Sequence, residues 1–552
     1  MTAAPDPWWR HAVCYQIYVR SFADSDGDGL GDLAGIEQRL PYLARLGVDA
    51  IWLTPFYTSP QHDHGYDVAD YRDVDPRFGT LADFDAMLAR AHQLGLRVIV
   101  DIVPNHTSSE HPWFRAALAD PNGPERRRYL FRAGHGPGGE EPPNNWRSVF
   151  GGPAWTRVDD PAARPGSARA AGPEREARPE PPAQWYLHLF DATQPDLDWT
   201  NPEVGDEFCS ILRFWLDRGV DGFRIDVAHG LRKQEGLPDV ADPLRRRPST
   251  MVERSAEDEP MWDRPEVHEV YRRWRKELDG YPGDRMAIAE AWVTSPSSMA
   301  RYIRPDELHQ AFNFLWLTAP WSADAFRRVI EQTLAAVGRV QASPTWVLSN
   351  HDVVRHPTRY GGGARGLARA RAATLTMLGL PGSAYLYQGE ELGLEQVYVP
   401  RRFWQDPGAL RTGEEGRDGC RVPMPWSGDR PPYGFSPGAG QPWLPQPADW
   451  APLTVSAQEA DPGSTLAFYR RLLAARRDFA VAAGDTVELI DTSQPVLAFR
   501  RGTLVCAVNC GSRPAAPPDE AGDLLIASGP GAADRLPPDT AAWYRAAAAI
   551  QS

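Results

Sequence analysis

The stretch VDGFRIDV, residues 220–227, is a short apolar run that ends in an arginine and an aspartate. It predicts a buried strand, because short runs rich in Val, Ile and Phe suit a pleated surface that packs on both faces. Seven other runs have the same form: AVCYQIYV (12–19), DAIWLTP (49–55), LRVIVDIV (96–103), MAIAEAW (286–292), QAFNFLW (310–316), TWVLSNHD (345–352) and SAYLYQGEE (383–391).

Helix-like stretches lie between these runs, among them ADFDAMLARAHQLG (82–95), VGDEFCSILRFWLDRG (204–219) and PEVHEVYRRWRKEL (265–278). Eight alternating strand–helix units predict a (β/α)₈ barrel. Periodicity alone leaves a doubly wound α/β sheet open as the alternative.

Two regions interrupt this alternation. After the third strand the chain is long and irregular, and it holds the Pro-, Ala-, Arg- and Glu-rich tract 159–184, which favours an inserted domain or a disordered lid. After the helix-like run 464–477, short strand-like runs such as VLAFRR (496–501) predict a small β-domain. The expected organisation is 1–106 first part of the barrel, 107–184 insertion, 185–478 second part of the barrel and 479–552 C-terminal β-domain.

The composition limits the classes of partner. The chain has 552 residues with a formal net charge of −14, so it offers no basic stripe for nucleic acid or for an anionic membrane, whereas a neutral substrate suits it. We find neither a secretory signal nor a long apolar run, and five sparse cysteines do not form a disulfide framework. We expect a cytoplasmic protein, and the oligomeric state is open.

Ionisable residues stand at the ends of several predicted strands. The third ends in Asp101 followed by Asn105 and His106, the fourth in Arg224 and Asp226, the fifth in Glu290, and the seventh in His351 and Asp352. A single acid at a strand end is usually a helix cap. Several acids at one mouth of a barrel are more often functional, because chemistry lies at the carboxyl ends of barrel strands and crowded like charges cost energy.

Glycoside cleavage requires such a set of acids. One carboxylate attacks the anomeric carbon while a carboxylic acid protonates the leaving oxygen, and retaining enzymes hold the two about 5–5.5 Å apart. Arg224 lies two residues before Asp226 on the same strand and therefore points to the same side, where it can orient the carboxylate and keep it ionised.

The ordered set DIVPNH, GFRIDV, AEAW and SNHD resembles the four signature regions of the α-amylase family, glycoside hydrolase family 13. The resemblance implies that Asp226 is the nucleophile, Glu290 the general acid/base and Asp352 the stabiliser of the transition state. It also implies that His106 and His351 contact the sugar, and that the insertion and the C-terminal strands are that family's domains B and C.

Three further segments resemble the α-glucosidase and oligo-1,6-glucosidase branch: 15–36, QPDLDW (194–199) and RDGCRVPMPW (417–426), which departs from the branch pattern at three positions. By this resemblance Tyr66 is a stacking ring, Asp67 binds a sugar hydroxyl, and Arg417 closes the pocket at the non-reducing end. Phe150 is a candidate wall of the pocket, with a core position as the alternative.

Rival functions share this machinery. Trehalose-forming isomerases and transglucosidases use the same carboxylates, and a sugar-binding homologue without activity usually lacks one of them, whereas all three are present in this chain. In the resembling branch a Val after the nucleophile accompanies α-1,6 cleavage. Val227 therefore favours isomaltose over maltose as substrate.

The loop DSDGDGLGD, residues 24–32, has acids at positions one, three, five and nine of an EF-hand-like pattern, and the glutamate of position twelve is missing. We expect one structural Ca²⁺ or Mg²⁺ and no organic cofactor. The candidate ligands are Asp24, Asp26, Asp28, Asp32 and the Leu30 carbonyl; the alternative is a solvated acidic turn.

Overall fold

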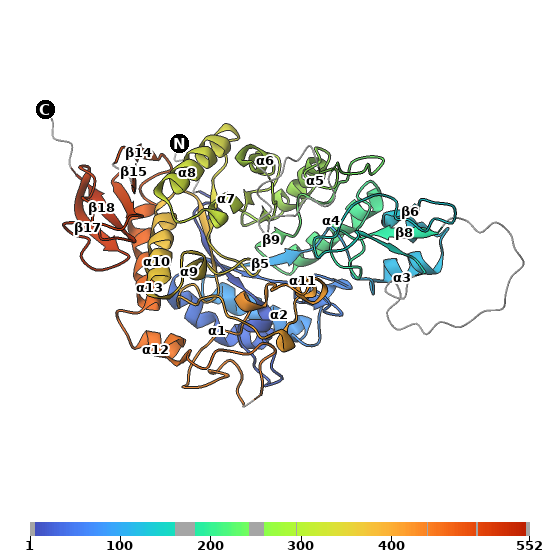
Figure 1. The fold of residues 1–552 in the computed structure, drawn as a ribbon, viewed down its shortest axis with the longest axis horizontal. Helices are drawn as coiled ribbons and strands as arrows, with labels where there is room; N and C mark the ends of the chain where they lie inside the picture. The colour runs from blue at the N-terminus through green and yellow to red at the C-terminus, as the bar shows by residue number, and fades with distance from the viewer. Residues whose placement is uncertain are drawn as a thin grey trace, which may run out of the picture.

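The computed structural model describes residues 6–159, 183–241, 259–293, 295–438, 440–492 and 495–547. An eight-stranded parallel sheet forms its centre, and the last strand of this set pairs with the first, which gives a nearly closed barrel (Figure 1). This confirms the predicted barrel over the doubly wound sheet. The strands are β1 (Val13–Ile17), β2 (Ala50–Leu53), β5 (Arg97–Ile102), β9 (Gly222–Ile225), β10 (Met286–Ala289), β11 (Gln310–Ala311), β12 (Thr345–Val347) and β13 (Ser383–Tyr387).

The sixth predicted strand is shorter than its sequence suggests. Only Gln310–Ala311 pair as β11, and the rest of the apolar run forms the helix α7 (Phe314–Thr318). Asn313 starts this helix, because its side-chain oxygen accepts the backbone N–H of Trp316 at 3.1 Å. A single asparagine within a short apolar run is a weak signal of such a change from strand to helix.

Helices cover the outside of the barrel and agree with the predicted stretches to within a few residues. Local capping sets their starts: Thr80 and Asp83 form a capping box before α2, and the Asn201 side chain accepts the N–H of Glu203 in α4. The helices of the barrel are α1 (Leu33–Leu46), α2 (Leu81–Gln93), α4 (Pro202–Asp217), α5 (Val267–Asp279), α6 (Pro296–Arg301), α8 (Ala323–Arg339), α9 (His356–Arg359), α10 (Gly363–Gly379) and α11 (Pro407–Thr412).

The region after β5 is a small folded unit on one side of the barrel (Figure 1). It contains α3 (Pro112–Ala119) and the antiparallel sheet β6–β8–β7, formed by Phe131–Ala133, Gln184–Leu187 and Trp155–Arg157. Buried aromatic side chains such as Trp146 and Trp155 form its core, so the insertion is a domain rather than a bare loop. Most of the Pro- and Ala-rich tract, residues 160–182, lies outside the described residues.

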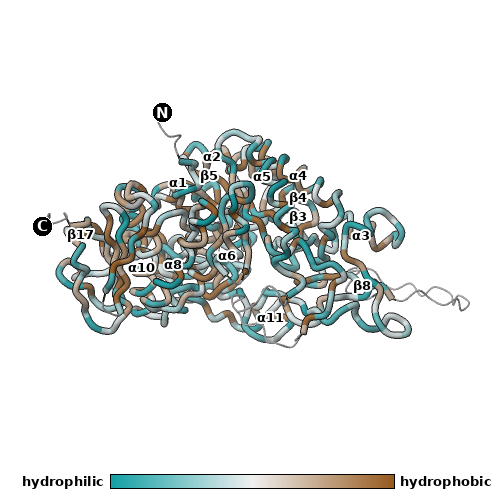
Figure 2. The backbone as a smooth tube through the Cα atoms, turned by 90° about the horizontal axis from the view of Figure 1, so that it is seen from above, coloured by the Kyte–Doolittle hydropathy of each residue, from teal (hydrophilic) through white to brown (hydrophobic). Residues whose placement is uncertain are grey.

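The C-terminal strands form the predicted β-domain, a five-stranded antiparallel sheet, and this sheet packs on α10. The Nε1 of Trp543 donates to the carbonyl of Leu375 in α10 at 3.1 Å, and Gly379 leaves room for that indole. Hydrophobic segments run along this sheet and α10 in Figure 2. The sheet follows α12 (Val455–Glu459) and α13 (Thr465–Ala475) and consists of β14 (Glu488–Ile490), β15 (Val496–Arg501), β16 (Leu504–Asn509), β17 (Ala521–Ala527) and β18 (Thr540–Ala546).

Two broad sequence expectations can be compared with these elements. All five cysteines are free thiols. Among the described residues, no helix is long and apolar enough to cross a membrane. The bounds of the four predicted segments stay predictions.

Candidate active site

The carboxyl ends of the barrel strands open into one cavity of about 370 Å³. It receives side chains that follow β2, β5, β9, β10 and β12, from the inserted unit and from the segment after β13. The lining includes Asp63, Tyr66, His106, Phe150, Asp226, Val227, Glu290, His351, Asp352 and Arg417. The fold therefore brings together every predicted catalytic residue and most of the predicted sugar-binding residues.

One arginine holds the inner end of this site. Nη1 of Arg224 lies 2.6 Å from Asp226 Oδ1 and 2.9 Å from Asp101 Oδ1, and its Nη2 lies 3.0 Å from Glu290 Oε2. The guanidinium is almost completely buried, so these three carboxylates are its partners in place of water. We call Arg224, Asp101, Asp226 and Glu290 the inner cluster.

The inner cluster carries three acids and one base, and this imbalance retains protons. Burial raises the pKa of Asp226 well above its usual value, against the pull of Arg224. Burial also raises the pKa of Asp101 to about 7. Asp226 and Asp101 therefore keep a proton to higher pH than isolated carboxyls would.

The backbone after β9 fixes the position of Glu290. The N–H of Val227 donates to Glu290 Oε2 at 2.8 Å, and Nε1 of Trp292 donates to Oε1 at 2.9 Å. Val227 has φ of 46°, a left-handed conformation that a β-branched residue rarely adopts. Such strain is typical of functional sites, and at Val227 it accompanies the contact with Glu290.

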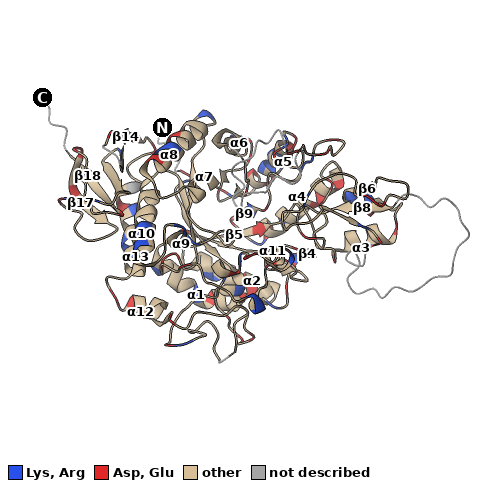
Figure 3. Cartoon of the chain, in the orientation of Figure 1, with Lys and Arg blue, Asp and Glu red and all other residues tan. Residues whose placement is uncertain are grey.

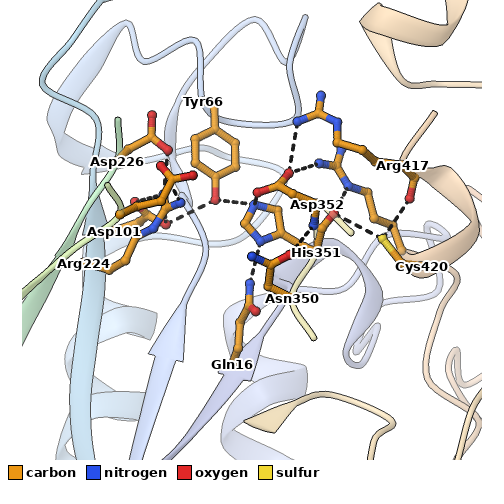
Figure 4. A network of polar contacts seen from close by, with 12 residues as sticks. Gln16, Tyr66, Asp101, Arg224, Asp226, Asn350, His351, Asp352, Arg417 and Cys420 are labelled. Carbon is orange, nitrogen blue, oxygen red and sulfur yellow. Dashed lines mark hydrogen bonds and ion pairs between the residues drawn. The ribbon is translucent and has the colours of Figure 1, made fainter. Parts of the chain in front are cut away.

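A second arginine holds the outer end. Arg417 contacts three carboxylates: Asp406 Oδ2 at 2.6 Å, Asp63 Oδ1 at 2.9 Å and Asp352 Oδ1 at 3.1 Å. We call Arg417, Asp63, Asp352 and Asp406 the outer cluster. Figure 4 shows Arg417 and Asp352 at one end of the polar network, Arg224, Asp101 and Asp226 at the other, and Tyr66 and His351 between them.

Asp352 and Asp406 of the outer cluster are more strongly anionic than the acids of the inner cluster, because a second arginine stabilises their charged forms. Arg421 Nη2 lies 2.9 Å from Asp352 Oδ1. Burial alone would raise the pKa of Asp352 and of Asp406. His351, followed by Arg417 and Arg421, holds the pKa of Asp352 well below the usual range, and the two arginines hold that of Asp406 there. Asp63 differs, since burial raises its pKa to about 6.

The aromatic residues between the clusters join them. The rings of Tyr66 and His351 stack with centroids 5.4 Å apart, and the Tyr66 hydroxyl lies 2.7 Å from His351 Nε2 and 3.2 Å from Asp101 Oδ2. Burial lowers the pKa of His351 well below its usual value, and lowers that of His106 to about 4. Both histidines are therefore neutral groups that form hydrogen bonds.

The prediction for Asp67 is wrong in position. Its two carboxylate oxygens accept the backbone N–H groups of His62 and Asp63 at 2.9 and 3.0 Å, and the side chain is buried outside the cavity lining. Asp63, four residues earlier, faces the cavity and pairs with Arg417. The segment DHGYD contains two acids, and residue type alone does not tell which of them caps the turn.

Phe150 belongs to the cavity wall, although it is also largely buried. Its ring lies 5.0 Å from the Arg417 guanidinium and 5.7 Å from the ring of Phe190, both in the lining. Several residues of the site were not predicted from the sequence. These are Asp63, Phe190, His229, Trp292, Asp406 and Arg421. Of these, Trp292 and Arg421 stand inside quoted motifs, whereas Asp406 has no local signal.

The acidic loop brings three of its five predicted ligands together. Carboxylate oxygens of Asp24, Asp26 and Asp28 lie within 4.8 Å of one another. Hard oxygen donors at this spacing fit Ca²⁺ or Mg²⁺. Asp32 instead caps α1, since its oxygens accept the N–H groups of Gly35 and Ser25 at 2.6 and 2.7 Å. The Leu30 carbonyl has no contact that tests it.

Asn105, which the sequence left without partners, belongs to a second polar group. Its side chain contacts Asp196 at 3.1 Å and accepts from Lys233 Nζ at 2.9 Å, and the same ammonium lies 2.7 Å from Asp196. The Lys233 side chain is 3% exposed. A lysine of the chain thus supplies the positive charge in this group of oxygens.

A barrel with three carboxylates and two arginine clusters in one closed-ended cavity defines a glycoside hydrolase. The model of the alpha amylase catalytic domain matches residues 16–163 and 177–484, and a domain of unknown function, DUF3459, matches residues 470–543. The chain belongs to the alpha-amylase family.

Curated relatives cover most of the chain. A probable alpha-glucosidase of Rhizobium meliloti (strain 1021) is 40% identical over 90% of this chain and 87% of its own length. An oligo-1,6-glucosidase of Parageobacillus thermoglucosidasius is 35% identical over 89% and 87%. A trehalose-6-phosphate hydrolase of Escherichia coli (strain K12) is 36% identical over 91% and 89%.

Solved structures give the same fold with varied activities. The alpha-glucosyl transfer enzyme XgtA has a TM-score of 0.84 at 38% identity and covers 98% of this chain and all of its own. The trehalulose synthase MutB of Pseudomonas mesoacidophila MX-45 has a TM-score of 0.84 at 30% identity and covers 99% of this chain.

Proposed function

We propose that this chain is a retaining α-glucosidase that releases glucose from the non-reducing end of short α-glucosides. The observation that carries the proposal is the outer cluster. Arg417 bridges Asp63, Asp352 and Asp406, and Phe150 lies against its guanidinium. A cavity closed in this way accepts one terminal sugar ring, not the middle of a polymer.

The inner cluster supplies the chemistry in two steps. The Asp226 carboxylate attacks the anomeric carbon as the bond to the leaving oxygen breaks, and Glu290 donates its proton to that oxygen. Water then attacks the glucosyl–Asp226 ester and returns a proton to Glu290, which releases glucose with its original anomeric configuration. Asp352 stabilises the positive charge of both transition states.

Linkage preference depends on the space beside the leaving group. Val227 lines the cavity next to Glu290, together with His229 and Trp292. A stiff β-branched side chain there narrows the room for an α-1,4-linked ring, whereas an α-1,6 link has an extra rotatable bond. We propose that kcat/KM is higher for isomaltose than for maltose. The expected difference is about 10-fold, because a clash with one methyl group provides a difference of that order.

The test is a set of kcat/KM values on maltose, isomaltose, sucrose, trehalose and kojibiose, with free glucose as the measured product. Isomaltose is expected to be the best of the five and Val227→Thr to raise the maltose value. A maltose value tenfold above isomaltose would overturn the linkage preference. Conversion of maltose into trehalose without net glucose release would overturn the hydrolase itself.

Transglucosylation is a second candidate, favoured by the likeness to a solved structure named an alpha-glucosyl transfer enzyme. A sugar hydroxyl competes with water for the same glucosyl–Asp226 ester. Product analysis at rising maltose concentration separates the two, because hydrolysis releases two glucose molecules per maltose cleaved, whereas transfer releases one glucose and moves the other glucosyl unit to a second maltose as trisaccharide.

We also propose one structural Ca²⁺ or Mg²⁺ in the loop of Asp24, Asp26 and Asp28. The carbonyl of Leu30 and the carboxylate of Asp32 would complete the donor set. When bound, the ion neutralises the crowded carboxylates and orders the loop; it does not enter the reaction. The cytoplasmic location stays a prediction of the sequence.

A further inference from the structure

We propose that Glu414 and Glu415 make the mouth of the cavity a charge filter, which selects uncharged or cationic leaving groups and disfavours anionic ones such as sugar phosphates. The inference rests on the proposed α-glucosidase activity and names the substrate class of the same site.

Among the described residues, the lining offers no unpaired cation to an anion. Within the described part of the chain, Arg417 is the one Lys or Arg side chain in the lining, and it already contacts three carboxylates. Behind the lining, Arg224 is likewise shared among three acids. The sugar-facing histidines His106 and His351 are neutral, because burial lowers the pKa of both.

The mouth itself is acidic. Helix α11 ends at Gly413, whose φ of 74° turns the chain, and Glu414 and Glu415 follow as exposed residues that line the cavity. Together with Thr412 and Gly416 they are the exposed residues of the described lining, and the other lining residues are buried or half-buried. We take this exposed stretch as the side on which a leaving group reaches solvent. Any charge on the leaving group therefore passes near two carboxylates.

Neighbouring arginines do not cancel these charges. Arg411, on the last turn of α11, pairs with Asp191. Arg401, in the short 3-10 helix Arg401–Phe403, approaches Gly413 but lies outside the cavity lining. Over the whole molecule basic and acidic residues are interspersed, as Figure 3 shows, so the acidic mouth is a local feature.

The size of the effect follows from Coulomb interactions in water. Two carboxylates at about 6–8 Å from a charged substituent change its binding several-fold each at low salt, and screening reduces this near 0.15 M salt. We expect an overall spread of about tenfold between a cationic and an anionic leaving group. The filter separates this chain from the similar protein named a trehalose-6-phosphate hydrolase.

Three aryl α-glucosides test the filter without depending on linkage: 4-hydroxymethylphenyl, 4-carboxyphenyl and 4-aminomethylphenyl α-glucoside. We expect kcat/KM to fall in the order cationic, neutral, anionic at low salt, and the spread to shrink at 0.5 M NaCl. Equal values for the three compounds, or a preference for the anionic one, would overturn the proposal.

Variants at the mouth of the cavity test whether Glu414 and Glu415 cause the charge preference. We compare the ratio of kcat/KM for the cationic glucoside to kcat/KM for the anionic one. The double variant Glu414→Gln with Glu415→Gln should lower this ratio about tenfold, and Arg401→Gln should raise it slightly. The matched control is Asp519→Asn with Glu520→Gln, an exposed acidic pair of the C-terminal domain, which should leave the ratio unchanged. An undiminished ratio in the Glu414/Glu415 variant would overturn the assignment to these residues.

Failure of the proposed function gives a different result. If the neutral aryl glucoside is not hydrolysed, the α-glucosidase proposal fails. The dissociation constants of the same three compounds, measured by calorimetry on the full chain, then decide the charge preference by the same order and the same variants.

Discussion

The two arginine clusters of the active site have the same composition and opposite protonation behaviour. In the inner cluster, Arg224 alone serves three carboxylates, and burial raises the pKa of both Asp226 and Asp101. In the outer cluster, Arg417 has the help of Arg421, and the pKa values of Asp352 and Asp406 lie well below the usual range.

The difference in pKa values indicates that the inner and outer ends of the cavity have different functions. One unmatched arginine leaves Asp226 and Asp101 with raised pKa values, so the inner end keeps a proton to higher pH. Arg417 and Arg421 keep Asp352 and Asp406 anionic, which suits the binding of sugar hydroxyls and the stabilisation of a cationic transition state, whereas burial raises the pKa of Asp63 to about 6. A second positive charge four residues after Arg417 thus gives the two ends different protonation within one cavity.

The largest expected effect comes from the inner cluster. Asp226→Asn removes the attacking carboxylate, so kcat should fall by on the order of 10⁴-fold or more. Glu290→Gln should spare 4-nitrophenyl α-glucoside relative to maltose, because a good leaving group needs little protonation. Single-turnover rates on both substrates measure this. Equal losses on both substrates for Glu290→Gln would remove Glu290 from the acid role.

A smaller effect distinguishes Asp63, a member of the outer cluster, from Asp67, which lies four residues later in the chain. Asp63→Asn breaks a contact with Arg417 in the cavity, so KM for maltose should rise about 10–100-fold with little change in thermal stability. Asp67→Asn disturbs a buried turn instead, and should lower the free energy of unfolding by about 1–3 kcal/mol with little change in KM. The opposite pattern would return the sugar-binding role to Asp67.

The pH dependence sharpens the comparison further. The active form carries the proton of the inner cluster, so kcat/KM should decline as pH rises through about 7, the pKa of Asp101. Asp101→Asn takes this titrating carboxyl away and keeps the site uncharged at that position, so the limb at about pH 7 should be lost. Asp63→Asn, in the outer cluster, should leave the limb in place. A limb that moves with Asp63 would contradict the division of labour.

The smallest effect concerns the acidic loop, which is distant from the chemistry in both clusters. Removal of a bound ion by EDTA should lower Tm by a few degrees, because a ligand of the native state stabilises it. Asp26→Asn with Asp28→Asn should abolish that difference. Elemental analysis that finds no metal, together with an unchanged melting curve, would refute the ion.

The fold and the inner cluster could be predicted from the sequence because their signals are local. The run VDGFRIDV predicts a strand by its apolar residues. It also contains, two residues apart, the arginine and the aspartate that form an ion pair in the structure. The same holds for AEAW and for SNHD. Local pattern was less reliable for QAFNFLW, where an asparagine starts a helix within an apolar run.

The outer cluster could be predicted only in part because distant segments build it. Asp406 lies in no motif, and it reaches Arg417 because it caps α11 and faces back across the loop. Asp63 and Asp67 are the same residue type four positions apart, and only the turn decides which one faces the cavity. Lys233 meets Asn105 across more than a hundred residues.

The most direct test of the account is the anomeric configuration of the first product. Glucose released from 4-nitrophenyl α-glucoside, whose leaving group carries no anomeric centre, is observed by ¹H NMR within the first minutes, before mutarotation mixes the anomers. A retaining pair formed by Asp226 and Glu290 predicts α-glucose as the first product, whereas β-glucose would show inversion and contradict the covalent mechanism at the inner cluster.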